Sequence, residues 1–139
     1  MEGNDNILWL LKQAAYSGRR AVDDVVAEHG VTGTQLGILN RLADEPGLSG
    51  AELARRSLIT SQAAQLALAS LERRGLVERK PDPAHGRIVK SYLTDQGREV
   101  VEACLEAGFR AQGEFVSVLS PAEQRKLAEM LRRLVRGPG

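Results

Sequence analysis

Two glutamines and one arginine have the residue types and spacing that best suit contact with a nucleic acid. Gln62 and Gln65 lie three residues apart, so a helix through them would present both on its exposed side. A glutamine amide can both accept from and donate to an adenine edge in the major groove. Arg87 follows Gly86 in a turn-like stretch, from which a long cation can reach a minor groove. Without a nucleic acid, all three would be ordinary solvated side chains.

Positive charge is concentrated in the middle of the chain. Residues 49–90 carry eight basic and four acidic side chains, whereas residues 1–48 carry four and seven, and residues 91–139 carry seven of each. The whole chain has a net charge of only +1. A basic middle segment would therefore attract phosphate without making the whole protein basic.

Further polar residues of this segment are candidates for phosphate contacts. Thr60 and Ser61 lie at an expected helix N-terminus, which suits a phosphate better than a base edge. The other candidates are Arg73, His85 and Lys90. A solvated loop explains His85 and Lys90 equally well, and some of the basic residues are expected to be no more than soluble surface.

Catalytic and metal-binding patterns are absent from the sequence. It has no glycine-rich phosphate loop, no nucleophile elbow and no metal-ligand spacing. His29, His85 and the single cysteine, Cys104, are too few for a structural zinc site. We therefore expect no enzyme, no metal and no cofactor; a small enzyme would have to depend on these three side chains. Cys104 suits inert packing on an apolar helix face, with an oxidation sensor as the alternative.

Size and composition indicate one mainly helical domain. The chain has 139 residues, of which 42% are hydrophobic, 27% charged and 4% aromatic, which favours an aliphatic, helical core over a β-sandwich. One cysteine indicates a reducing compartment, the cytoplasm. The apolar run at 7–11 is short and is preceded by Glu2 and Asp5, so we expect neither a signal peptide nor a membrane span.

Capping patterns divide the first half of the chain into three helices. Apolar residues at helical spacing predict a long amphipathic helix over 4–30. Thr32 with Gln35 predicts the start of a second helix, which ends at 45–47. Ser49 with Glu52 predicts a third, over 51–57. The residues expected to point inward from this third helix are Leu53, Ala54 and Leu58.

The next segment predicts a helix-turn-helix followed by a wing. A fourth helix over 61–74 follows a short turn, with Gly75 ending it. Its expected inward row is Ala64, Ala67, Leu68 and Leu71. Residues 76–80 and 87–94 then read as a β-hairpin. The expected inward residues of the hairpin are Val77, Val89 and Leu93.

Two further amphipathic helices follow, one from Asp95 and one from the Ser120-Pro121 start with Glu123. The first has an apolar face through Val101, Cys104, Leu105 and Phe109, and the second through Leu127, Met130, Leu131, Leu134 and Val135. Because these helices and the first one flank the basic segment, their apolar faces need a partner. A second copy of the chain would supply it in a C2 dimer, and packing within one chain is the alternative.

Several motifs together resemble the MarR family of bacterial transcription regulators. They are Ser49-Gly-Ala-Glu-Leu-Ala-Arg-Arg, Ile59-Thr-Ser-Gln-Ala, Leu71-Glu-Arg-Arg-Gly-Leu-Val-Glu-Arg, Asp82-Pro, Gly86-Arg87 and Leu93-Thr-Asp-Gln-Gly97. The resemblance implies a single domain over 1–139, mainly α with a small β-hairpin wing. It would comprise a winged helix-turn-helix at 32–94 and dimerisation helices at 4–30 and 95–136.

This chain departs from the usual pattern of the family at three positions. His85 stands where the wing often has an aspartate that pairs with arginine, so the wing must be held in another way. Ala63 and Leu66 occupy recognition-helix positions that often carry threonine and arginine, so the usual target sequence is not expected. The peroxide-sensing branch carries its reactive cysteine in the first helix, which lacks cysteine here.

The resemblance implies a homodimeric repressor that binds a pseudo-palindromic operator on double-stranded DNA, with recognition helices about 34 Å apart. It also implies possible release by a small aromatic or other lipophilic effector. Trp9 and Tyr16 are the candidate pocket residues, although such a pair is more often plain core or interface. The competing hypothesis is an interaction module or antirepressor that has lost DNA binding, which Leu66 and the absent wing aspartate keep open.

Overall fold

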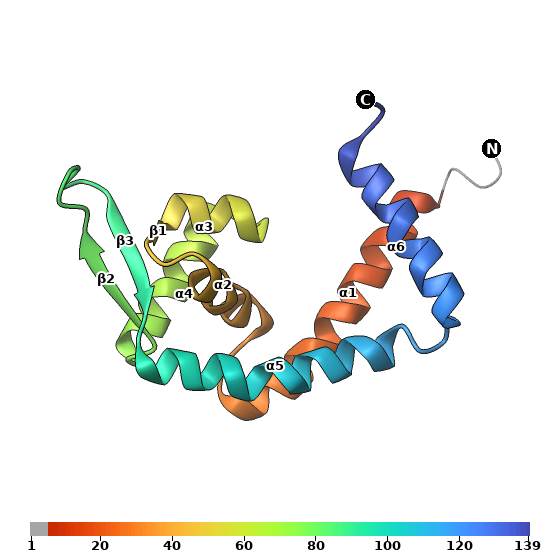
Figure 1. Ribbon diagram of the computed structural model, residues 1–139, viewed down its shortest axis with the longest axis horizontal. Helices are drawn as coiled ribbons and strands as arrows, with labels where there is room; N and C mark the ends of the chain where they lie inside the picture. Colours follow the sequence, from red (N-terminus) through yellow and green to blue (C-terminus); the bar gives the residue numbers. More distant parts are fainter. Residues whose placement is uncertain (1–5) are drawn as a thin grey trace.

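The computed structural model describes residues 6–139 and shows a winged-helix unit joined by one long helix to two projecting helices (Figure 1). In chain order the elements are α1 (Ile7–Val26), a 3-10 turn (Ala27–His29), α2 (Gly33–Asp44), β1 (Leu48–Ser49), α3 (Gly50–Ser57), α4 (Ser61–Arg73), β2 (Val77–Pro81), β3 (Val89–Leu93), α5 (Asp95–Phe115) and α6 (Pro121–Arg136). The expected helix start at Asn4, and Glu2 and Asp5 with it, lie outside the described residues.

Three helices begin with the capping boxes that the sequence predicts. In each, the cap hydroxyl accepts the backbone N–H of the residue three positions on, whose side chain accepts the N–H of the cap in return. The pairs are Thr32 with Gln35 in α2, Ser49 with Glu52 in α3 and Ser120 with Glu123 in α6. Local sequence therefore determines where these helices start.

The hydrophobic core lies where α2, α3 and α4 pack on the first half of α5 and the end of α1. Its fully buried side chains include Val26, Ile38, Leu39, Leu42, Leu53, Leu68, Leu71 and Cys104. The inward row expected for α4 is confirmed, because Ala64, Ala67, Leu68 and Leu71 are all buried. This packing fixes which side of α4 is left facing outward.

A three-stranded antiparallel sheet in the order β1-β3-β2 forms the wing. Val77 pairs with Leu93 at the base of the hairpin, and Pro81 pairs with Val89 near its tip. The strand β3 begins at Val89 instead of Arg87. The inward position expected for Val89 is wrong, since this residue is 42% exposed. It shares a face with buried Ser91, but Val89 borders an open cavity between the wing and the helices α3 and α4, which do not cover it.

Leu58 also differs from the expectation, because it points outward with 91% of its surface exposed. It is the C-cap of α3 and adopts a left-handed backbone conformation, with φ at 56°. This residue reverses the direction of the chain, and the N–H of the following Ile59 donates to the carbonyl of Ala54. Ile59 then packs against the core in the place expected for Leu58.

The Leu-Glu-x-x-Gly and Leu-Thr-x-x-Gly motifs, 22 positions apart in chain order, meet at the start of α5. The hydroxyl of Thr94 donates to the carbonyl of Gly75 at 2.6 Å and accepts from the N–H of Gly97 at 3.1 Å. Gly97 is buried, and a side chain there would collide with the carbonyl of Leu76. The glycine and threonine of these motifs therefore join the wing to α5.

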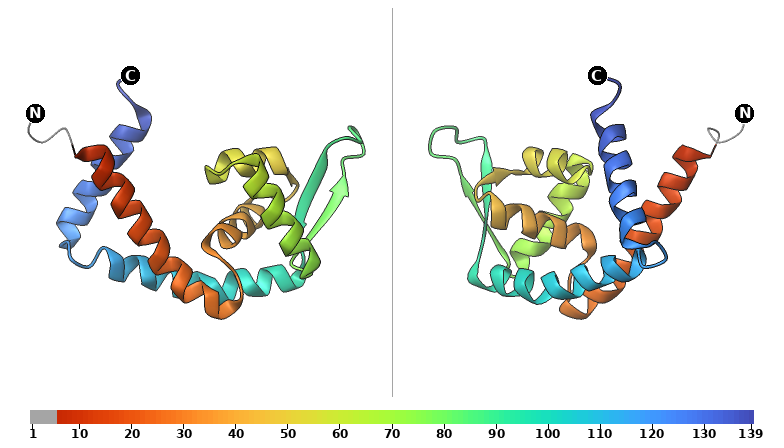
Figure 2. Two further views of the ribbon diagram at one scale, coloured as in Figure 1. Left: turned by 180° about the vertical axis from the view of Figure 1, so that it is seen from behind. Right: turned by 45° about the vertical axis from the view of Figure 1, so that its right-hand side comes forward.

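The two projecting helices expose their apolar faces within the protomer. None of the residues of α6 is buried, so the packing within one chain that was the alternative for its apolar row does not occur. Large exposed hydrophobic residues lie along α1, the second half of α5 and α6: Ile7, Leu8, Trp9, Leu10, Leu105, Phe109, Leu127, Met130, Leu134 and Val135. Figure 2 shows α1 and α6 projecting from the end of α5 that is remote from the wing.

Candidate nucleic-acid interface

The outward ridge of α4 consists of Gln62, Leu66, Ala69 and Arg73. These residues follow a spacing of four, three and four, so they line one side of the helix. Gln62, Leu66 and Arg73 are exposed, and Ala69 is half-buried. Because the opposite side is packed in the core, this ridge is the surface that α4 presents to a ligand.

The N-terminus of α4 is capped by its own chain. The hydroxyl oxygen of Thr60 accepts from the backbone N–H of Ala63 at 3.0 Å. Thr60 and Ser61 are both exposed, and the first amides of a helix have no acceptor within it. The free backbone N–H groups of this first turn, together with the positive end of the helix dipole, can hold a phosphate.

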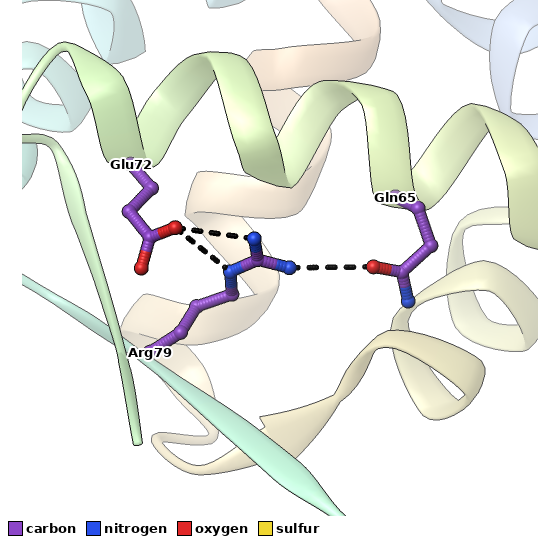
Figure 3. Close-up of polar contacts among 3 residues, drawn as sticks. All are labelled: Gln65, Glu72 and Arg79. Atoms are coloured by element: carbon purple, nitrogen blue, oxygen red, sulfur yellow. Dashed lines mark hydrogen bonds and ion pairs between the residues drawn. The ribbon is translucent and has the colours of Figure 1, made fainter. Parts of the chain in front are cut away.

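Gln65 lies on a different side of α4 from the outward ridge and contacts the wing (Figure 3). Its Oε1 accepts from Nη1 of Arg79, in β2, at 3.3 Å. The same guanidinium donates through Nε and Nη2 to Oε1 of Glu72 at 3.2 and 3.1 Å. Since arginine only donates, the amide oxygen of Gln65 must face it, and the amide nitrogen is the end of the amide that points away from Arg79. Sequence reasoning missed this role of Arg79, because the contact depends on how the wing folds against α4.

Asp82 holds the tip of the wing, which has a histidine at position 85. Its Oδ1 accepts from the N–H of Ala84 at 2.9 Å, and its own N–H donates to the carbonyl of Ile88 at 2.7 Å. Its Oδ2 lies 3.5 Å from Nζ of Lys90. The hydrogen bond from Ala84, followed by the charge of Lys90, lowers the pKa of Asp82. The tip therefore has a defined shape, and Lys90 is partly engaged within it.

Arg87 is exposed at this tip together with His85 and Gly86. Within residues 6–139, Arg87 forms no ion pair. A cavity of about 420 Å³ separates the wing from α3 and α4, and both Gln65 and Arg87 line it. The structure therefore brings these two predicted residues to the walls of one concave surface, whereas Gln62 and Arg73 lie on the outward ridge.

The candidate effector residues lie elsewhere. Trp9 and Tyr16 are both on α1 and are 56% and 62% exposed. Each ring has a cation near it, since Nζ of Lys12 lies 6.0 Å from the Trp9 ring and Cζ of Arg20 lies 5.9 Å from the Tyr16 ring. Their position on a projecting helix is compatible with an interface between protomers.

The part of the chain that the structure describes offers little for other chemistry. Residues 6–139 contain no group of three metal-ligating side chains, and no described helix combines the length and apolar character that crossing a membrane requires. Cys104 is buried in the core, and burial raises the pKa of its thiol. A thiol in that environment has little reactive thiolate.

Comparisons with known proteins agree with this geometry. The model of the MarR family matches residues 29–88. The HTH-type transcriptional repressor Rv2887 of Mycobacterium tuberculosis is 31% identical over 126 residues, which cover 91% of each chain. A crystal structure of a probable transcriptional regulator from Pseudomonas aeruginosa superimposes with a TM-score of 0.85 at 29% identity, covering 94% of this chain and 98% of that one.

Rv2887 has also been solved in complex with DNA and in complex with salicylic acid. The DNA complex has a TM-score of 0.75 at 29% identity and covers 92% of this chain and 96% of Rv2887. The salicylic acid complex has a TM-score of 0.78 at 29% identity and covers 96% and 99%. Sequence and fold thus lead to one conclusion, which confirms the prediction from the motifs: the chain belongs to the MarR family and has its winged helix-turn-helix fold.

Proposed function

We propose that this protein is a sequence-specific DNA-binding transcription regulator, most simply a repressor, that acts as a homodimer. The proposal rests on one observation. The outward ridge of α4 and Arg87 of the wing, which forms no ion pair within residues 6–139, lie on the same positively charged winged-helix unit. The similarity to Rv2887, a repressor whose complex with DNA has been solved, supports the same function.

In this proposal α4 enters the major groove and the wing follows the adjacent minor groove. Gln62 reads an adenine edge, and Gln65 contributes only through its amide nitrogen because Arg79 holds its oxygen. Arg87 enters the minor groove. Thr60, Ser61, Arg73, His85 and Lys90 contact phosphates, which position the protein and supply most of the affinity.

The dimer follows from the exposed apolar surface of the projecting helices. We assign residues 32–94 to the DNA-binding module and residues 4–30 and 95–136 to dimerisation within the single domain 1–139. A C2 pair would cover the apolar face of α6, no residue of which is buried in the protomer. It would also place two recognition helices about one DNA turn, on the order of 34 Å, apart on a pseudo-palindrome.

Release by an effector requires a ligand that prefers a conformation in which the two recognition helices are wrongly spaced. The salicylic acid complex of Rv2887 supports a small aromatic acid as the ligand class. The N–H of Gly33, at the start of α2, donates to Oδ1 of Asp23, in α1, at 2.6 Å. Movement of the projecting helix α1 would therefore reach the DNA-binding module directly.

The proposed role is regulatory and non-catalytic, and its place is the cytoplasm, where the chromosome lies and where a thiol such as Cys104 stays reduced. The relatives with which it shares most of its length are transcription regulators.

Fluorescence anisotropy tests the proposal. The full-length protein is used to select duplexes from a random library, and binding to the selected duplex is measured at several salt concentrations with random duplex as competitor. We expect tight, competitor-resistant binding that weakens steeply with salt. Arg87→Ala should weaken it by about 1–3 kcal/mol.

Arg110→Ala is the matched control, because Arg110 lies on α5 and, among residues 6–139, pairs with Glu106 of the same helix and with no other acidic residue. It should leave DNA affinity unchanged. Failure to select any duplex above random would contradict the proposed function and favour an interaction module. Equal affinity of the Arg87→Ala variant and the unaltered protein would contradict the role of the wing.

A further inference from the structure

The outward ridge of α4 contains a leucine where a polar residue would be expected. Leu66 lies between Gln62, four residues before it, and Arg73, seven residues after it. Its side chain is 66% exposed. Because α4 already has a complete buried face, Leu66 does not contribute to the core that holds the helix in place.

The neighbours of Leu66 restrict what it can contact. Ala63 and Ala69, beside it on the helix, are small and half-buried, so Leu66 protrudes between a polar amide and a guanidinium. A protein partner generally needs a continuous apolar patch at the centre of its interface, and one leucine between polar residues does not provide one. A groove of DNA provides isolated apolar groups within a polar surface.

Base edges in the major groove differ in how they would accept a leucine. Most of their groups are hydrogen-bond donors or acceptors, and covering one with an aliphatic side chain removes its water without replacing the bond. The 5-methyl group of thymine is the exception, since it is apolar and projects into the groove. Contact with it would bury both apolar groups.

We propose that Leu66 selects thymine at the base pair it faces, by contact with the 5-methyl group. This inference rests on the proposed function, because it requires α4 to lie in a major groove. Gln62, which lies one helical turn before Leu66, would read adenine. The outward ridge would therefore favour A·T base pairs opposite the centre of the ridge. Gln65 does not compete for this role, since Arg79 holds its oxygen on the wing side.

Deoxyuridine provides the test, because it pairs as thymine does and lacks only the 5-methyl group. The probe is the duplex selected by the full-length protein, in which each thymine of both half-sites is replaced in turn by deoxyuridine. Affinity is measured by anisotropy for the unaltered protein and for Leu66→Ala. Because Leu66 is exposed, this substitution should have little effect on the stability of the fold.

At one position per half-site, the replacement should weaken binding of the unaltered protein about fourfold, the value of one buried methyl group. Leu66→Ala should bind the thymine duplex more weakly by at least that factor and should show no further loss with deoxyuridine at the same position. Leu58→Ala, which shortens a leucine in the turn before α4, should keep the full sensitivity to deoxyuridine.

Two results would overturn the inference while leaving the proposed function intact. One is selection of a duplex in which no thymine methyl group affects binding. The other is a Leu66→Ala variant that binds as tightly as the unaltered protein or remains equally sensitive to deoxyuridine. Failure to select any duplex would overturn the proposed function first, and the inference with it.

Discussion

A glutamine that reads adenine must offer both ends of its amide, and the two glutamines of α4 differ in this respect. Gln62 stands exposed on the outward ridge, and within residues 6–139 its amide forms no hydrogen bond with another side chain. The oxygen of Gln65 accepts from Arg79, an interaction across 14 positions that depends on how the wing folds back on α4. Residue type alone therefore ranks the two equally, and tertiary contact separates them.

Alanine at each glutamine should therefore give different results. Gln62→Ala should cost about 1–3 kcal/mol of DNA affinity and relax the preference at one base pair. Gln65→Ala should cost less, because it removes mainly a contact within the protein. Anisotropy on the selected duplex and on single base-pair variants measures both effects, and a larger loss for Gln65→Ala would contradict the assignment.

The capping carboxylate of α3 makes stability depend on pH. Hydrogen bonds from the backbone and side chain of Ser49 lower the pKa of Glu52 below its ordinary value of 4.5. A lowered pKa in the folded state stabilises the protein at pH values above the ordinary pKa, and this contribution is lost as pH falls through the folded value.

Ser49→Ala should therefore destabilise the protein by about 1 kcal/mol at pH 7 and by less at a pH below the folded pKa of Glu52. Urea unfolding of both proteins at the two pH values gives the comparison, and taking the difference between them cancels the other carboxylates. Because the backbone N–H of residue 49 still donates to Glu52 in this variant, a pH-independent difference would show that the hydroxyl of Ser49 does not stabilise the ionised carboxylate.

At the scale of elements, Asp82 holds the turn at the tip of the wing, beyond the paired strands β2 and β3. Asp82→Ala would remove both the hydrogen bond from Ala84 and the ion pair with Lys90, and Asp82→Asn would keep an acceptor for Ala84 while removing the charge. We expect faster amide hydrogen exchange at Ala84 and weaker DNA binding in the alanine variant, with the asparagine variant between it and the unaltered protein.

Equal exchange at Ala84 in all three proteins would mean that the turn does not need this carboxylate. Tighter DNA binding by Asp82→Asn, with exchange at Ala84 unchanged, would assign the effect to the freed Lys90 instead.

Local signals in the sequence predicted the elements well where a cap or a helical period defines them. Ser49 with Glu52 and the buried row of α4 lie as expected. The inward positions expected for Leu58 and Val89 were wrong. Periodicity does not show where the chain turns, as it does at Leu58, or where helices cease to cover a strand, as they do at Val89. The two-residue strand β1 was missed, since its pairing of Leu48 with Ser91 depends on the folded wing.

For the whole molecule, the exposed apolar faces of α1, α5 and α6 favour association of two protomers. Leu134 is 60% exposed in the protomer, so lysine there should leave the protomer intact and disfavour a dimer. We expect Leu134→Lys to sediment as a monomer, or to dissociate at higher concentration, and to bind the selected duplex poorly.

Glu129→Lys introduces the same side chain on the opposite side of α6 and should leave sedimentation unchanged. An unaltered dimer for Leu134→Lys would show that the apolar face of α6 is not the pairing surface.

The separation of the projecting helices from the wing by the length of α5 (Figures 1 and 2) has a genetic consequence. A chain with Arg87→Ala would keep its whole pairing surface, so in a cell that also makes normal chains it would enter mixed pairs. Such a mixed dimer would bind tightly to only one half-site of a palindrome. Since only a minority of pairs would then contain two normal wings, the defective allele would be dominant over the normal one.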